Sequence, residues 1–275
     1  MTNDPSRPWD AARGYANVNN LTMYYEIHGE GQPLVLLPGA MGTIESCFAN
    51  LMPMLARTRR VIAAELQGHG RTPDVDRPLS YEQMGDDLAG LLLALDIDAA
   101  DFVGYSMGGA AAFQLALRHP SVVRRLVVAG GTCYRPDGLY PEMQPGSGSP
   151  TPEDLAGSPW HHAYLDVAPD PAAWPTLVAK VGELDAGFAG WSADEVRSLQ
   201  APTLLMIGDS DIVRPEHTME MFRLLGGGVV GDLVGLPASQ LAVLPGTSHV
   251  GLLERVDWLH SMITGFLDPT KEDEP

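Results

Sequence analysis

Six short apolar runs, each ending in turn residues, alternate with longer helix-like segments, and this alternation constrains the fold more than any other feature. The runs span residues 33–39, 60–66, 100–106, 124–131, 202–209 and 239–246. The helix-like segments span residues 44–58, 80–96, 107–120, 215–226 and 250–267. Continuous apolar runs are typical of strands buried on both faces. Their alternation with helices predicts an α/β fold, in which helices wrap a mostly parallel sheet.

Residues 17–29 follow a different pattern, in which apolar and polar residues alternate around Asn19 and Asn20. A short period-two pattern with Asn-Asn at its centre is typical of a hairpin. This segment therefore predicts two antiparallel strands at an edge of the sheet.

Residues 133–200 interrupt the alternation. They contain many prolines, a "PGSGSPTP" stretch and three of the five tryptophans, and they lack a convincing buried strand. A structureless loop of this length is unusual in a compact domain. We therefore expect a mainly helical cap at residues 133–200, inserted into a core formed by residues 1–132 and 201–275.

The balance of charge and the cysteine content exclude several classes of protein. The formal net charge of -18 repels nucleic acid and anionic membrane surfaces. Cys47 and Cys133 have neither metal-ligand spacing nor the density of a disulfide scaffold, which favours a reducing compartment. No secretory signal or spanning segment of about 20 apolar residues is recognisable. The chain is expected to be a soluble cytoplasmic protein.

Ser106 lies in "GYSMG", between an apolar strand and an alanine-rich helix. Gly-x-Ser-x-Gly occurs readily by chance, so its context decides. A serine on a sharp turn from strand to helix is exposed at the carboxyl edge of a sheet, where such folds bind ligands. Ser106 is therefore the candidate nucleophile.

A serine nucleophile needs a base, and the base needs an orienting acid. His249 in "PGTSHVG" follows the last apolar run and can reach the same sheet edge. Asp209 and Asp211 in "GDSD" are the candidate acids. Asp209 sits at a strand tip, where aspartate often caps a turn, whereas Asp211 lies farther out in the loop. Asp211 is preferred, and the choice stays open.

The ordered motifs "GYSMG", "GDSD" and "GTSH", preceded by "LLPGAMG" and "ELQGHGRT", resemble the α/β-hydrolase fold superfamily, in particular its serine esterase-like members with a helical cap. The resemblance covers residues from about 20 to 268. It implies a sheet of about eight strands with a cap inserted after the sixth. It also implies Ser106 as nucleophile, Asp211 as acid and His249 as base.

The same resemblance implies an oxyanion hole formed by the backbone N–H groups of Ala40 and Met107. Relatives usually carry His-Gly after the third strand, but this chain carries Pro38-Gly39. Because the donors are backbone groups, the hole is expected to survive, although the missing histidine changes how the loop is held. Aromatic and sulfur side chains are expected to line a pocket for an apolar substrate; the candidates are Tyr105, Met143, Trp160, Tyr164 and Trp191.

Two further motifs are interpreted as unrelated to cofactors. "GGGVVG" at residues 226–231 matches a dinucleotide fingerprint but follows a helix, so it is expected to be a flexible loop. The adjacent His161 and His162 point differently and have no ligand cluster nearby, so a metal site is not expected. The chain is thus expected to use no cofactor.

A serine at the elbow favours acyl transfer, whereas dehalogenases and epoxide hydrolases of this fold use an aspartate there. The expected function is hydrolysis of a carboxylic ester of a small, mainly apolar substrate. Cleavage of a carbon-carbon bond, lactone, amide or peracid by the same triad stays open. A non-catalytic small-molecule receptor is the alternative of another class. A homodimer is also left open.

Overall fold

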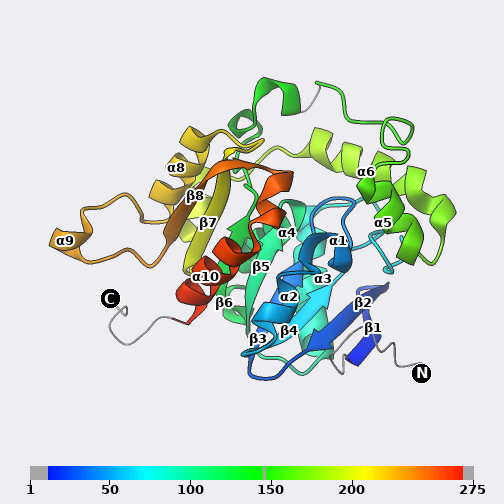
Figure 1. Cartoon of the computed structure of the whole chain (residues 1–275), viewed down its shortest axis with the longest axis horizontal. Coiled ribbons are helices and arrows are strands. Elements are labelled where there is room, and N and C mark those ends of the chain that lie inside the picture. The colour runs from blue at the N-terminus through cyan, green and yellow to red at the C-terminus, as the bar shows by residue number, and fades with distance from the viewer. Residues whose placement is uncertain (1–11, 145–146, 269–275) are drawn as a thin grey trace.

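An eight-stranded sheet forms the centre of the protein, in the order β1-β2-β4-β3-β5-β6-β7-β8 (Figure 1). The computed structural model describes residues 12–144 and 147–268. The strands from β3 onward run parallel to one another, and β2 pairs antiparallel with both β1 and β4. The strands are β1 (Ala12–Val18), β2 (Leu21–His28), β3 (Gln32–Leu37), β4 (Arg59–Ala64), β5 (Ala100–Tyr105), β6 (Val123–Ala129), β7 (Thr203–Ser210) and β8 (Gln240–Ser248). The predicted α/β fold, with about eight strands, is confirmed.

The predicted hairpin is formed by β1 and β2. Its two turn residues, Asn19 and Asn20, have φ angles of 47° and 66°. Two residues of positive φ give a turn whose twist matches that of the paired strands, and asparagine tolerates this conformation. The hairpin lies at one edge of the sheet, as the sequence predicts.

Helices cover both faces of the sheet, so its strands have two buried sides. Val35 and Leu37 of β3 face one apolar cluster, and Leu34 and Leu36 face the other. The first cluster includes α3 (Tyr81–Ala94), α4 (Met107–Arg118) and α8 (Pro215–Leu224). The second includes α1 (Ile44–Phe48), α2 (Met52–Leu55) and α10 (Val256–Leu267). Burial on both sides explains why the strands are continuous apolar runs rather than alternating ones.

The segment between β6 and β7 is helical. Among its described residues, 133–144 and 147–200, no named strand occurs. Its helices are α5 (Pro159–Val167), α6 (Trp174–Gly187) and α7 (Ala193–Ser198), and its short 3-10 turns are η2 (Pro136–Gly138), η3 (Pro141–Met143) and η4 (Pro171–Ala173). Figure 1 shows it running along the upper side of the sheet, with α5 and α6 on the right. Its division from the core as a cap domain stays a prediction.

An extended arm joins α8 to β8 and carries α9 (Gly231–Val234), which projects to the left in Figure 1. The segment "GGGVVG" is therefore mostly loop, and its last glycine begins this short helix. Two more 3-10 turns, η1 (Pro120–Val122) and η5 (Val250–Glu254), precede β6 and α10. Within residues 12–144 and 147–268, no helix combines the length and the apolar character required to cross a membrane.

Candidate active site

Ser106 occupies a sharp turn between β5 and α4. Its φ and ψ angles are 53° and -119°, a conformation that residues other than glycine rarely adopt. Its backbone N–H donates to the Ala129 carbonyl at 2.8 Å, and its own carbonyl accepts from the Ala110 N–H at 3.1 Å. Hydrogen bonds on both sides therefore hold the strained residue, and the side chain is only partly buried.

The glycines of the motif are required by close packing. A Cβ atom at Gly104 would lie 2.3 Å from the Gly108 carbonyl oxygen, and one at Gly108 would lie 2.3 Å from the Leu37 carbonyl oxygen. Both contacts are with backbone, which has little freedom to move. The turn at Ser106 therefore needs a glycine two residues before it and another two residues after it.

The structure brings Ser106, His249 and Asp211 together at the carboxyl ends of three parallel strands. His249 Nε2 lies 3.0 Å from Ser106 Oγ, and His249 Nδ1 lies 2.8 Å from Asp211 Oδ1. Because a carboxylate can only accept, Nδ1 carries a proton, which leaves Nε2 of the neutral ring able to accept from the serine. The Asp211 side chain is fully buried, whereas that of His249 is 15% exposed.

The two aspartates of "GDSD" have different partners. Asp209 accepts from the backbone N–H groups of Gly246 at 2.9 Å and Thr247 at 3.1 Å, and these hydrogen bonds lower its pKa. Asp211 accepts from His249 and from its neighbour Ile212 at 2.7 Å. Asp209 thus fixes the irregular pairing at the ends of β7 and β8, while Asp211 contacts the imidazole.

Tyr105 is 6% exposed and contacts His249, and its assignment to a substrate pocket stays a prediction. Its hydroxyl donates to the His249 backbone carbonyl at 3.1 Å, and the two rings lie 5.2 Å apart. A Cβ at Gly130 would approach the Tyr105 ring to 2.6 Å. Side chains alternate between the two faces of the sheet along β5, and Tyr105 points to the face covered by α1, α2 and α10. Tyr105 therefore supports the loop that carries the histidine.

Trp191 and Tyr164 are also buried. Trp191 is 6% exposed, its ring lies 4.7 Å from that of Phe113 in a tilted arrangement, and its indole N–H donates to Gln114. Tyr164 is 4% exposed, and its ring lies 5.3 Å from that of Trp174. Trp191 also lines a surface cavity of about 240 Å³ beside α3 and α6. The assignment of both side chains to a substrate pocket stays a prediction.

Met143 and Trp160 are open to solvent, with exposed fractions of 49% and 36%. Met143 ends η3 and Trp160 lies in the first turn of α5. Both belong to the inserted segment, and their assignment to a substrate pocket stays a prediction.

The backbone segments that carry Ala40 and Met107 meet beside the nucleophile. A Cβ at Gly39 would lie only 3.2 Å from the Ser106 Cβ, so the loop after β3 passes directly along the elbow. Met107 is the first residue of α4, so its N–H has no acceptor within the helix. The location suits both amides to an oxyanion hole, and their role as donors stays a prediction.

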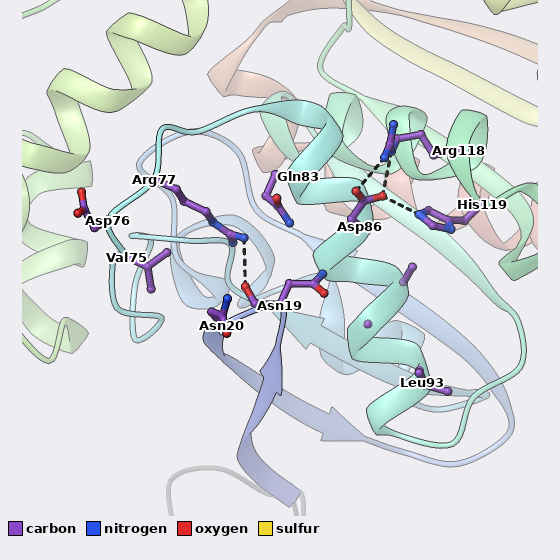
Figure 2. A pocket seen from close by; sticks show the side chains of 12 residues that line it. Asn19, Asn20, Val75, Asp76, Arg77, Gln83, Asp86, Leu93, Arg118 and His119 are labelled. Atoms are coloured by element: carbon purple, nitrogen blue, oxygen red, sulfur yellow. Dashed lines mark hydrogen bonds and ion pairs between the residues drawn. The ribbon is translucent and has the colours of Figure 1, made fainter.

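A surface cavity of about 960 Å³ lies away from this site (Figure 2). Figure 2 shows Asp86 bound to Arg118 and His119, and Arg77 bound to Asn19. Arg118 is the last residue of α4 and Ser106 precedes its first, so the two are separated by about 18 Å along the helix axis. The cavity is therefore not part of the triad site.

The comparisons with known proteins agree with the fold. A family model described as "alpha/beta hydrolase fold" matches residues 32–150. The 2-hydroxymuconate semialdehyde hydrolase of Pseudomonas sp. (strain CF600) is 42% identical over 106 residues, which cover only 37% of this chain and 37% of that protein. The sn-1-specific diacylglycerol lipase ABHD11 of Mus musculus is 27% identical over 256 residues, covering 83% and 76%.

Solved structures share the whole fold. A serine hydrolase involved in carbazole degradation, the CarC enzyme, superposes with a TM-score of 0.75 at 22% identity and covers 94% of this chain and 100% of its own. Together with the strand order and the family model over residues 32–150, these matches show that the chain has the α/β-hydrolase fold.

Proposed function

We propose that the protein is a serine hydrolase that cleaves a carboxylic ester of a small, mainly apolar substrate. The observation that carries this proposal is the pair of contacts, 2.8 Å and 3.0 Å, that links Asp211 to His249 and His249 to Ser106 on a strained elbow. Serine alone is a poor nucleophile at neutral pH, and this chain of contacts supplies the base that activates it.

The reaction follows from the proton positions. Ser106 Oγ attacks the ester carbonyl while His249 Nε2 takes its proton, and Asp211 stabilises the imidazolium that forms. The tetrahedral intermediate collapses when His249 protonates the leaving alcohol, which leaves an acyl-serine. Water then attacks the acyl group, with His249 again as base, and the acid is released.

Ala40 and Met107 are proposed to bind the oxyanion of both intermediates through their N–H groups. Removing one such donor typically raises the barrier by roughly 3 to 4 kcal/mol. Because Met107 is adjacent to the nucleophile, the strain at Ser106 and the aim of this donor are set by the same turn.

Hydrolysis of a carbon-carbon bond is the second candidate. It is supported by the 42% identity over 106 residues with 2-hydroxymuconate semialdehyde hydrolase, an alignment that covers 37% of each chain. The same triad can also cleave lactones, amides and peracids. The substrates in the test below distinguish between these reactions.

The test is turnover of p-nitrophenyl esters of increasing acyl length, with a ring-cleavage diketone and a lactone as comparison substrates. We expect short and medium esters to be cleaved best, and Ser106→Ala to lose at least about 10³-fold in kcat. Ester turnover by that variant at the wild-type rate would refute the assignment. Ligand binding with no turnover, and no labelling of Ser106 by a fluorophosphonate, would instead favour a receptor.

A further inference from the structure

The loop of residues 38–43 contains a second strained position. Met41 has a φ angle of 60°, which an unbranched side chain rarely adopts without support from its surroundings. The Gly42 N–H donates to the Gly39 carbonyl at 3.0 Å and closes the turn around Ala40 and Met41. This bond lies within the loop, so it shapes the turn without fixing it against the sheet.

Glu65 connects the end of this loop to the neighbouring strand. It follows β4, its side chain is fully buried, and its Oε1 accepts from the Ile44 N–H at 3.1 Å. Ile44 is the first residue of α1 and comes directly after the loop. Since that N–H has no acceptor within the helix, the carboxylate supplies one from outside.

The Glu65 carboxylate is itself fixed. Its Oε2 accepts from the Arg71 backbone N–H at 2.6 Å, and its Oε1 also accepts from Arg71 Nη1 at 3.1 Å. Arg71 binds both oxygens of Glu45 on α1, at 2.6 and 3.1 Å. A Cβ at Gly70 would lie 2.3 Å from the Glu65 carboxyl carbon, so the carboxylate fits tightly under that glycine.

We propose that Glu65 is a positioning residue for the oxyanion hole: through the Ile44 N–H it holds the loop that carries Ala40 in the strained form that aims the Ala40 amide at the substrate. This role rests on the proposed function.

The charged state of Glu65 controls the strength of this contact. Arg71, Glu45 and the thiol of Cys47 face it; the pKa of that thiol is raised mainly by burial and, to a smaller extent, by the charge of Glu65. Burial raises the pKa of Glu65 to about 7, although the hydrogen bonds and the charge of Arg71 oppose this shift. Below that pH the carboxyl is protonated and is a weaker acceptor for the Ile44 N–H.

Two variants break the contact from opposite sides. Glu65→Gln keeps the shape but replaces one accepting oxygen by an NH₂ that faces donors. Ile44→Pro deletes the donor and leaves the buried pair of Glu65 and Arg71 intact; proline is favoured at a first helical position, and Thr43 before it is already extended. Glu45→Gln is the matched control, because it removes a carboxylate from Arg71 without touching Ile44.

The readout is the rate constant for labelling of Ser106 by a fluorophosphonate, which needs the nucleophile and the oxyanion hole but no knowledge of the substrate. At pH 8 we expect Glu65→Gln and Ile44→Pro to label roughly 10- to 100-fold more slowly than wild type, and Glu45→Gln to stay near wild type. Towards acid, the wild-type rate should fall more steeply than the rate of Glu65→Gln, because only the wild type has a carboxyl at this position that protonates near pH 7.

The proposal is overturned if folded Ile44→Pro and Glu65→Gln label at the wild-type rate, or if Glu45→Gln slows labelling as much as they do. Thermal unfolding of each variant shows whether slow labelling comes from an unfolded protein or from a displaced loop in a folded one. Ile44→Pro remains informative if Glu65→Gln fails to fold. If wild type labels rapidly but cleaves no ester, the proposed substrate class fails and the positioning role stands.

Discussion

At the scale of single residues, strain in the backbone gathers around the candidate site. Five non-glycine residues among those described have positive φ, and three of them are asparagine or aspartate, which tolerate it. The other two are Ser106 and Met41, which lie on the two segments that meet beside the nucleophile. Such conformations persist only where neighbouring contacts fix them, so the site depends on residues that touch no substrate.

The two aspartates of the β7 loop provide a matched pair of variants. Asp211→Asn removes the negative charge and can turn an NH₂ donor towards His249 Nδ1, which favours the wrong tautomer, so kcat should fall by roughly 10³- to 10⁴-fold with little change in fold. Asp209→Asn weakens the bonds to Gly246, Thr247 and Ser210 and should lower the melting temperature while kcat stays near wild type. Steady-state kinetics and thermal unfolding check both, and an equal loss of kcat in the two variants would contradict this division of roles.

Glu26 gives a prediction for the dependence of stability on pH. Burial opposes its ionisation, but hydrogen bonds from His28 and Tyr24 and the charge of Arg13 outweigh it and lower its pKa to about 2. Its contribution is therefore complete above the ordinary glutamate pKa and is lost as the pH falls towards 2. Glu26→Gln should reduce the free energy of unfolding by roughly 2 to 3 kcal/mol at pH 7, and by less at each step below pH 5.

Urea unfolding from pH 7 to pH 3 measures this difference, with the exposed Glu30→Gln as control. A gap between wild type and Glu26→Gln that stays constant across this range would show that the stabilisation does not come from the ionised carboxylate.

At the scale of elements, the sequence predicts strands and helices well because each has its own local pattern. The run at residues 100–106 and the glycines around Ser106 are enough to place the elbow. Contacts between elements are different: the Tyr105 hydroxyl meets the His249 carbonyl 144 residues away, and Glu65 meets Ile44 across 21 residues. These depend on the strand order, which no local pattern contains. The choice between Asp209 and Asp211 stayed open for the same reason.

The helix α6 is fastened to the loop after β4 by one lysine. Lys180 Nζ donates to Asp74 Oδ2 at 2.7 Å and to two backbone carbonyls of the same loop at 2.9 and 2.7 Å. Lys180→Met should lower the free energy of unfolding by roughly 1 to 2 kcal/mol, because a charged donor is lost, although Gln67 still donates to Asp74 and to both carbonyls. Arg197→Met removes an exposed pair with Asp194 and should change it by at most about 0.5 kcal/mol. Equal effects in urea unfolding would show that Lys180 does not fasten the helix.

At the scale of the whole molecule, the three residues of the proposed triad follow β5, β7 and β8. The parallel arrangement of these strands explains why the three side chains lie close together. Parallel strands present their carboxyl ends at one edge, so loops separated by more than a hundred residues open onto the same place. The order serine, aspartate, histidine along the chain is thus informative only together with the sheet. Any one of the three motifs alone would not distinguish a catalytic residue from a turn residue.

The arm between α8 and β8 should govern self-association. It exposes five apolar side chains: Val229, Val230, Leu233, Val234 and Leu236. The net charge of -18 keeps copies apart at neutral pH, and this repulsion disappears near the isoelectric point of about 4.6 and is screened by salt. We therefore expect the protein to self-associate as the pH approaches that point, through this arm, which has five exposed apolar side chains within eight residues.

Leu233→Ser and Leu93→Ser test this expectation as a pair, because the two leucines are 81% and 83% exposed but only Leu233 belongs to the arm. Sedimentation velocity at pH 8 and at pH 5, in low and high salt, measures the association of each protein. Wild type and Leu93→Ser should associate to the same extent, and Leu233→Ser should associate less. Burial of one isolated leucine between two copies removes little apolar area from water, whereas several neighbouring side chains buried together remove more. The two variants should therefore differ only if the arm forms the interface between the copies. Equal association of both variants at pH 5 would assign it to another surface.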